Sequence, residues 1–397
     1  MATLLKDIKV IELSHVMAAP TCGLMLADMG AEVIKVERLP DGDNIRKLGP
    51  FSNGVSGPFT MMNRNKKGVA LNLHSETGKE VLKKLILGAD VFIENYRAGA
   101  MENYGVGYHQ VKNENTRLIY CSISGFGRTG VFSERGGFDL VAQGMSGIMS
   151  ITGEGEDRPP VKVGAPITDI SAGNLAAMGI LAALVSRNKT GRGQYVDTSL
   201  FEAGIMHTYW QSSIYLGSGE VPKAMGSAHP LMAPYQAFRT KDGWINLGSA
   251  NQGLWEKLIL VLGAQDLLED NKYKDPKSRL DNINDLESSL TKYFLEDTTD
   301  NWVRRLEKEG VPSGPVLDIA EMTQNQQTLD REMIKELPGD NALRVIGHPV
   351  KFSESSTEIN YSAPELGEHT REVMHGLGYS SEQVKELIEL GAVVCSD

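Results

Sequence analysis

The chain has 397 residues, 41% of them hydrophobic and 23% charged, which is the composition of a globular protein with a large core and room for two domains. Its net charge of -11 argues against a surface built for nucleic acid, so any polyanionic ligand needs a local basic cluster. Three scattered cysteines, Cys22, Cys121 and Cys395, argue against a disulfide framework or a zinc site.

The N-terminal residues lack the basic, apolar and small-residue order of a signal peptide. No segment approaches the roughly 20 uncharged apolar residues of a membrane helix. Motifs for a P-loop, a serine hydrolase, H-E-x-x-H or C-x-x-C are absent, and the eight histidines are dispersed. We therefore expect a cytoplasmic protein with no bound metal, no nucleic-acid partner and no membrane partner.

Strand and helix patterns alternate through the N-terminal part of the chain. Residues 8–13 predict a strand, 20–30 a helix with proline near its start and glycine at its end, and 32–37 a second strand. The alternation continues to about residue 125, which predicts an α/β fold with a mostly parallel sheet.

A single carboxylate interrupts the apolar segment "VGAPITDISAGNLAAMGILAAL" at residues 163–184. Asp169 either caps a buried helix predicted over 173–185 or carries chemistry, and this stretch alone favours the cap.

The composition changes near Gly217, where residues 217–230 are rich in Gly, Ser and Pro and indicate a linker. Residues 235–249 then predict two antiparallel strands joined by a turn at 241–243. Near the end of the chain, Ser380 has the spacing of a capping box and predicts a helix that packs back on the large domain. The expected organisation is a large domain over 1–216, a linker and small domain over 217–330, and a return to the large domain over 331–397.

The motif "GFGRTG" at residues 125–130 matches the G-x-G-x-x-G pattern of dinucleotide-binding proteins and follows a predicted strand. That fingerprint also needs a helix opening inside the motif, and the polar, glycine-rich residues that follow do not predict one. NAD binding is therefore disfavoured.

Basic residues cluster after the predicted strands. Arg38 and Arg97 each follow a strand, and "NRNKKG" at 63–68 has three cations in four positions. Loops at the carboxyl ends of parallel strands are where open α/β sheets bind ligands, so this rim suits a phosphorylated compound. Taken singly, each charge is more simply explained as solvated surface.

Segments along nearly the whole chain together resemble the class III coenzyme A transferases (CaiB/BaiF type), the family of the formyl-CoA:oxalate, carnitine and succinate-glutarate CoA-transferases. The matching segments include "LSHVMAAPTCGLMLADMGAEVIKVER", "MNRNKKGVALNL", "ENYRAGAMENYGVGY", "SGFGRTGVFSERGGFDLVAQGMSGIMSITG", "VGAPITDISAG", "KTGRGQYVDTSLFEA", "GVPSGPV" and "APELGEHTREVM". The resemblance implies a Rossmann-like large domain, a smaller α+β domain and a homodimer of two interlocked rings.

The resemblance also implies a set of site residues. The family's catalytic aspartate falls on Asp169, and Phe138, Asp139, Gly248 and Gly253 fall at positions of active-site support. Residues on or beside coenzyme A contacts are His15, Val16, Arg38, Asn95, Tyr96 and Arg97. A basic residue of the family is Asn103 here, which weakens the expectation of pyrophosphate contacts in that loop.

The implied reaction is the transfer of coenzyme A from an acyl-CoA, with succinyl-CoA preferred, to a small carboxylic or dicarboxylic acid through a covalent aspartyl intermediate. Coenzyme A is then a thioester substrate, with no tightly bound cofactor. Acyl-CoA racemases share the fold but need a histidine where this chain has Phe138, so racemisation is the disfavoured alternative. A noncatalytic CoA-binding protein is a further alternative, against which the intact Asp169 argues.

Overall fold

The structure is a computed structural model that describes residues 4–155, 157–338 and 343–396. The chain divides into two compact units, the first of residues 1–148, 162–208 and 327–397 and the second of residues 149–161 and 209–326. The first unit thus ends at residue 208 rather than the expected 216, and it resumes at residue 327 rather than 331. Residues 149–161, expected in the large domain, belong to the second unit.

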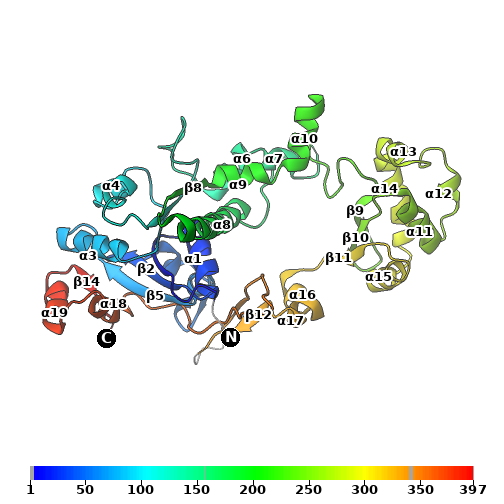
Figure 1. The fold of residues 1–397 in the computed structure, drawn as a ribbon. Helices are drawn as coiled ribbons and strands as arrows, with labels where there is room; N and C mark the ends of the chain where they lie inside the picture. Colours follow the sequence, from blue (N-terminus) through cyan, green and yellow to red (C-terminus); the bar gives the residue numbers. More distant parts are fainter. Residues whose placement is uncertain (1–3, 156, 339–342, 397) are drawn as a thin grey trace. The chain divides into compact units, whose positions relative to one another are not determined.

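The first unit is built on a seven-stranded sheet (Figure 1) in the order β14-β5-β2-β1-β6-β7-β8. The strands are β1 (Lys9–Leu13), β2 (Glu32–Arg38), β5 (Lys66–Leu71), β6 (Val91–Glu94), β7 (Ile119–Ser124), β8 (Tyr195–Ser199) and β14 (Val393–Val394). Each neighbouring pair is parallel except β14 with β5. The α/β class and the mostly parallel sheet predicted from sequence are confirmed.

Helices cover both faces of this sheet. They are α1 (Ala18–Asp28), α2 (Gly57–Asn63), α3 (Glu76–Leu87), α4 (Ala100–Asn103), α5 (Tyr108–Val111), α6 (Asp139–Met145), α8 (Ile167–Thr190), α9 (Leu200–Met206), α18 (Thr370–Gly376) and α19 (Ser381–Glu389), with the 3-10 turn η1 (Asn44–Lys47). Two small hairpins complete the unit, β3 (Phe51–Ser52) with β4 (Val55–Ser56) and β12 (Ile334–Glu336) with β13 (Arg344–Ile346).

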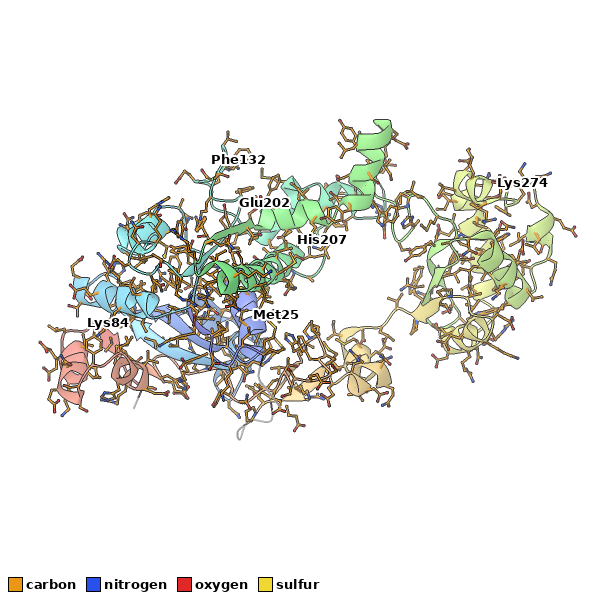
Figure 2. The ribbon with its side chains drawn as sticks, in the orientation of Figure 1. Met25, Lys84, Phe132, Glu202, His207 and Lys274 are labelled. Atoms are coloured by element: carbon orange, nitrogen blue, oxygen red, sulfur yellow. The ribbon has the colours of Figure 1, made fainter. Side chains whose placement is uncertain are left out.

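Strand alternation divides the buried side chains into two cores. On β1, Ile11 and Leu13 pack with α3, α18 and α19, whereas Val10 packs with α1, α8 and α9. The C-terminal segment belongs to the first of these cores: Nζ of Lys84 on α3 (labelled in Figure 2) lies 4.0 Å from the ring centroid of Tyr379, just before α19. The capping box at Ser380 is present.

Helix α8 has 24 residues and holds an 18-residue window of mean hydropathy 1.5, so its length and composition would allow it to cross a membrane. The expectation that no segment approaches this length is therefore wrong. Core helices of globular domains pass the same test, and Ala172, Ala176 and Ile180 of α8 are fully buried in the core shared with α1 and the sheet.

The second unit has a three-stranded antiparallel sheet of β9 (Tyr235–Arg239), β10 (Trp244–Gly248) and β11 (Ser313–Pro315), so the predicted hairpin is confirmed. Its helices are α10 (Tyr209–Ser218), α11 (Gln252–Leu262), α12 (Asp266–Glu269), α13 (Pro276–Asp281), α14 (Ile283–Phe294), α15 (Thr299–Lys308) and α16 (Ile319–Gln324). Helices α7 (Ile148–Ile151) and α17 (Gln326–Asp330) contain points where the chain passes between the units. Trp255, Phe294 and Trp302 lie in its core.

Candidate active site

The sequence-predicted binding residues meet at one edge of the large sheet. The chain runs β1, β2, β5 to one side and then β6, β7, β8 to the other, so β1 and β6 are neighbours across the point where the order reverses. His15 follows β1, Arg38 ends β2, and Tyr96 follows β6. Ligands of open α/β sheets bind outside the carboxyl ends of the strands at such a point.

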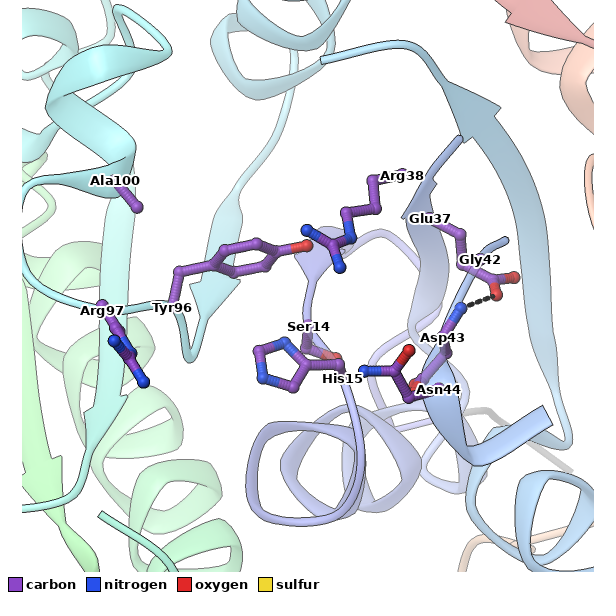
Figure 3. Close-up of a pocket in the computed structure, with 10 residues that line it drawn as sticks. All are labelled: Ser14, His15, Glu37, Arg38, Gly42, Asp43, Asn44, Tyr96, Arg97 and Ala100. Carbon is purple, nitrogen blue, oxygen red and sulfur yellow. Dashed lines mark hydrogen bonds between the residues drawn. The ribbon is translucent and has the colours of Figure 1, made fainter. Parts of the chain in front are cut away.

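A pocket of about 340 Å³ opens at this edge. Its lining residues are Ser14, His15, Glu37, Arg38, Gly42, Asp43, Asn44, Tyr96, Arg97 and Ala100. Figure 3 shows the hydroxyl of Tyr96 directed toward the guanidinium of Arg38. The rings of His15 and Tyr96 meet edge to face with centroids 5.1 Å apart. Burial raises the pKa of Tyr96 to about 12 and lowers that of His15, so both are neutral near pH 7.

Asn95 acts on the backbone beside the pocket. Its Oδ1 accepts a hydrogen bond from the His15 N–H at 3.1 Å, and its Nδ2 donates to the His15 carbonyl at 2.9 Å. The next residue, Val16, has φ 64°, and its N–H donates to the carboxylate of Asp43 at 3.1 Å. The side chain of Asn95 therefore fixes the backbone of the loop that carries His15.

Asp169 lies in a second pocket, of about 240 Å³, whose lining also includes His15, Val16, Asn95, Tyr96 and Arg97. We call the pocket lined by Arg38 the basic pocket and the pocket lined by Asp169 the Asp169 pocket. The two adjoin, because both are lined by His15, Tyr96 and Arg97. A ligand with a phosphorylated end and a reactive end can span them.

Asp169 is not the helix cap that its local sequence favoured. Helix α8 begins at Ile167 and its N-cap position is Pro166, which makes no side-chain capping bond. Burial, together with the negative charge of Asp139, raises the pKa of Asp169 to about 7. A carboxylate with this pKa is unusually basic, and perturbed groups of this kind in a pocket mark functional sites.

Asp139 holds the start of α8. Its Oδ1 accepts hydrogen bonds from the backbone N–H of Thr168 at 3.0 Å and from the Thr168 hydroxyl at 2.8 Å. Its Oδ2 accepts from Gln143 at 2.7 Å. The adjacent Phe138 lines the Asp169 pocket and is 76% exposed. The structure thus connects Asp139 to Asp169 through one intervening residue.

The glycine-rich motif at 125–130 opens no helix, because the next helix is α6. Instead Gly125 packs on Gly137, where a Cβ on Gly125 would lie 2.6 Å from the Gly137 Cα. Arg128 of the motif makes an ion pair with Glu94 at 2.8 Å and donates to the Tyr96 carbonyl at 2.7 Å. The motif therefore ties this loop to the end of β6. Sequence reasoning missed Arg128, although it stands only four residues after the end of β7.

The interpretation of "NRNKKG" as a basic rim is wrong. Arg64 is buried in an ion pair with Asp28 at 2.7 Å, and Lys66 is buried beside Glu12 at 2.8 Å. Lys67 is paired with Glu32 and Glu372 on the surface. These cations are neutralised by the protein itself.

The remaining predicted residues belong to other elements. Asn103, at the end of α4, lines neither of these two pockets. Gly248 and Gly253 belong to the second unit, where Gly248 ends β10 and Gly253 lies in the first turn of α11. The loop between β10 and α11 therefore consists of residues 249–251.

Comparison with known proteins agrees with this architecture. The family model "CoA-transferase family III" matches residues 5–370. Succinyl-CoA:glutarate CoA-transferase of Mus musculus is 35% identical over 98% of this chain and 90% of its own length. Succinyl-CoA:mesaconate CoA-transferase of Haloarcula marismortui is 38% identical over 94% of this chain and 96% of its own. A crystal structure of a CAIB/BAIF family protein from Brucella suis has 36% identity and a TM-score of 0.86, covering 95% of this chain and all of that one.

The chain belongs to CoA-transferase family III. It is accordingly an enzyme that transfers coenzyme A between acyl-CoA thioesters and carboxylic acids.

Proposed function

We propose that this enzyme transfers coenzyme A from succinyl-CoA to a second small dicarboxylic acid, with Asp169 as the covalent nucleophile. The observation that carries the proposal is the pair of adjoining pockets, one beside Arg38 and one beside Asp169, joined through His15, Tyr96 and Arg97. The phosphorylated part of the coenzyme fits the first pocket, and the thioester then reaches Asp169 in the second.

The proposed chemistry balances without a further reactant. A carboxylate oxygen of Asp169 attacks the thioester carbonyl, the C–S bond breaks, and the thiolate leaves with its electron pair, giving a mixed anhydride. The thiolate then attacks the Asp169 carbonyl carbon and releases the donor carboxylate, which leaves an aspartyl-CoA thioester. The acceptor carboxylate repeats these two steps in reverse and restores Asp169.

The surroundings of Asp169 suit this role. Only the ionised carboxylate is a nucleophile, and burial, which raises its pKa to about 7, also makes the ion more basic and therefore more reactive.

Two arginines of the same pocket, which make no ion pair among the described residues, support a dicarboxylic acyl group. Arg97, Arg128 and Arg135 line it, and Arg128 is committed to Glu94. Among the described residues, Arg97 and Arg135 make no ion pair within 4 Å. They can receive the second carboxylate that succinyl and glutaryl groups carry. Relatives that act on succinyl-CoA with glutarate or mesaconate point to the same substrate class.

We also propose that the enzyme works in the cytoplasm as a homodimer of interlocked chains. Helix α10 supports the dimer, because none of its ten residues is buried in the single chain. Tyr209, Trp210 and Leu216 on this helix are exposed by 69%, 55% and 81%. A helix that presents large apolar side chains on a monomer indicates a protein partner. Sedimentation that gives a monomer at micromolar concentration would contradict this assembly.

The test is acyl exchange followed by mass spectrometry, with purified enzyme, succinyl-CoA and a panel of small mono- and dicarboxylic acids. New acyl-CoA species with the wild type and none with Asp169→Ala are expected. If no acid accepts coenzyme A, the proposal fails. Deuterium uptake at the α-carbon of a branched acyl-CoA would instead support the racemase alternative, despite Phe138.

A further inference from the structure

Four buried charges form a continuous chain of contacts beside the basic pocket. Nζ of Lys66 on β5 lies 2.8 Å from Glu12 on β1, and Nζ of Lys35 on β2 lies 3.4 Å from the same carboxylate. Lys35 also lies 3.0 Å from Asp43, in the loop after β2. All four side chains have 0% exposure. Asp43 also lines the pocket beside Arg38 (Figure 3), where its backbone N–H donates to Glu37 at 2.9 Å.

Burying such a cluster of charges in a core is energetically unfavourable compared with burying apolar side chains. Desolvating paired charges offsets most of their attraction, so apolar residues of similar volume are often at least as stable. Glu12 and Lys35 are directly paired across β1 and β2, with Val10 and Val33 in the apolar core on the same face. The sheet could therefore continue that core here, which makes a purely structural reason for the charges weak.

Helix α1 is adapted to the cluster. Gly23 stands in the middle of this helix, where glycine is less favourable than alanine. A Cβ at Gly23 would overlap the Glu12 carboxylate and lie 3.3 Å from Nζ of Lys66. The carboxylate has little freedom to move away, because Ser14, Lys35 and Lys66 hold it. Glycine at position 23 therefore leaves the space that the ion pairs of Glu12 occupy.

The far end of the cluster holds the backbone of the candidate site. Both carboxylate oxygens of Asp43 accept from the Val16 N–H, at 3.1 and 3.2 Å, while Lys35 fixes that carboxylate and also donates to the Ser14 carbonyl at 3.3 Å. Val16 has φ 64°, a left-handed conformation that a β-branched residue rarely adopts. The strained residue directly follows His15, whose ring lines both pockets.

We propose that Glu12, Lys35 and Asp43 are positioning residues for acyl-CoA binding, which hold the left-handed turn at Val16 and so keep the His15 imidazole in the pocket. The inference rests on the proposed binding of coenzyme A at this edge of the sheet. Lys35 keeps Asp43 charged and fixed, and the Asp43 carboxylate supplies the hydrogen bonds that stabilise the strained turn.

The first experiment measures the Kd of coenzyme A by calorimetric titration of the full chain. Asp43→Ala removes the acceptor of the Val16 N–H, and the Kd should rise at least tenfold. Glycine adopts positive φ without strain, so the same change in a Val16→Gly background should raise the Kd by less than threefold. This rescue separates a held turn from general damage.

Arg64→Met is the matched control. It breaks a different buried ion pair, that of Arg64 with Asp28 of α1. The two side chains are 2% and 1% exposed. Asp28 is the last residue of α1, roughly 16 Å along the helix from its start near Val16. The Kd of this variant should stay within twofold of the wild type. An equal loss of affinity in Arg64→Met and Asp43→Ala would overturn the inference.

A second measurement covers the case in which Asp43→Ala does not fold. Hydrogen exchange on the wild type should show the Val16 amide protected well beyond a loop amide open to solvent, and fast exchange there would refute the proposed contact. A folded Asp43→Ala with unchanged affinity would also refute it. Failure of the proposed function looks different: the wild type would bind coenzyme A, and Asp43→Ala would weaken that binding, yet no acid would accept the coenzyme.

Discussion

Asp169 and Asp43 are two largely buried aspartates of the first unit in opposite electrostatic surroundings. The carboxylate of Asp43 lies 3.0 Å from Nζ of Lys35 and accepts hydrogen bonds from the backbone N–H groups of Val16 and Ile45. Burial alone would raise its pKa, but Lys35 and these hydrogen bonds outweigh burial and lower it. Asp169 makes no ion pair within 4 Å among the described residues, and burial with the charge of Asp139 raises its pKa to about 7.

The two environments suit the two carboxylates to different roles. A carboxylate held by a cation and backbone donors is a fixed anion, and it can keep a loop in place. A carboxylate without such partners is costly to ionise and therefore reactive once ionised.

The largest effect is expected for catalysis at Asp169. Asp169→Ala should lower the rate of acyl exchange by about 10⁴-fold or more, because a covalent route has no substitute nucleophile. The Kd of coenzyme A should stay within twofold, since the alanine leaves the basic pocket intact. Rates come from mass spectrometry of exchange products and affinity from calorimetry. Turnover that survives the substitution would rule out the covalent route.

Stability should respond in opposite directions at the two sites. Lys35→Met leaves Asp43 buried without its cation and should lower the free energy of unfolding by about 3–5 kcal/mol. The matched control is Lys67→Met, which removes a partly exposed lysine of the neighbouring strand and should cost about 1 kcal/mol or less. Equal losses in the two variants would contradict the special status of the buried cluster.

The choice of probe matters for these measurements. All four tryptophans, Trp210, Trp244, Trp255 and Trp302, lie in the second unit. Tryptophan fluorescence therefore reports the second unit, and its transition serves as an internal control. Unfolding of the first unit has to be followed by calorimetry or by hydrogen exchange of amides in β1 and β2.

Asp169→Asn should stabilise the first unit. The pKa of Asp169 is about 7 in the folded chain against an ordinary value of 3.8, so between these values the folded state binds the extra proton and the free energy of unfolding falls as pH rises. Above pH 7 the ionised carboxylate costs up to about 4 kcal/mol, which the neutral amide avoids. Calorimetry should show a higher Tm for the variant at pH 8 and little change at pH 4. A gain of the same size at both pH values would show that the charge is not its cause.

The sequence analysis singled out Asp169 and did not single out Asp43. Asp169 lies in the continuous segment 163–173, so its position can be recognised from a pattern of consecutive residues. The Asp43 cluster joins residues from three strands and a loop, and Glu12 meets Lys35 only through strand pairing. Lys66 and Lys67 are adjacent and chemically alike in the sequence, yet one is buried and the other partly exposed.

The fold was predictable for a similar reason. Periodicity is local, so the alternating strands and helices could be identified, whereas the unit boundaries depend on contacts between distant segments and moved by several residues. We expected no segment of membrane-spanning length, but the apolar run that follows Asp169 reaches it, since a core helix and a membrane span can have the same composition.

Gly23→Ala tests the fit between α1 and the buried charges. In an ordinary helix this change gains about 1 kcal/mol of stability. Here the added methyl group meets the Glu12 carboxylate, so we expect a loss of about 1–3 kcal/mol. Gly179→Ala on α8 is a milder comparison, because its Cβ would lie 2.9 Å from one methyl group of Val196, which can shift. If Gly23→Ala stabilises the first unit, the Glu12 carboxylate is more mobile than its contacts indicate.

The smallest effect concerns the pH dependence of the reaction. Because only ionised Asp169 attacks, kcat/KM for exchange should rise with pH through about 7 and then level off. Asp139→Asn removes the neighbouring negative charge but keeps an oxygen that can accept from Thr168, so the rising limb should move to lower pH by less than one unit. The plateau rate should change little if the amide holds Thr168 in place, and it should fall if the start of α8 shifts. A limb that moves to higher pH would contradict the electrostatic coupling between the two aspartates, because removing a like charge can only make Asp169 easier to ionise.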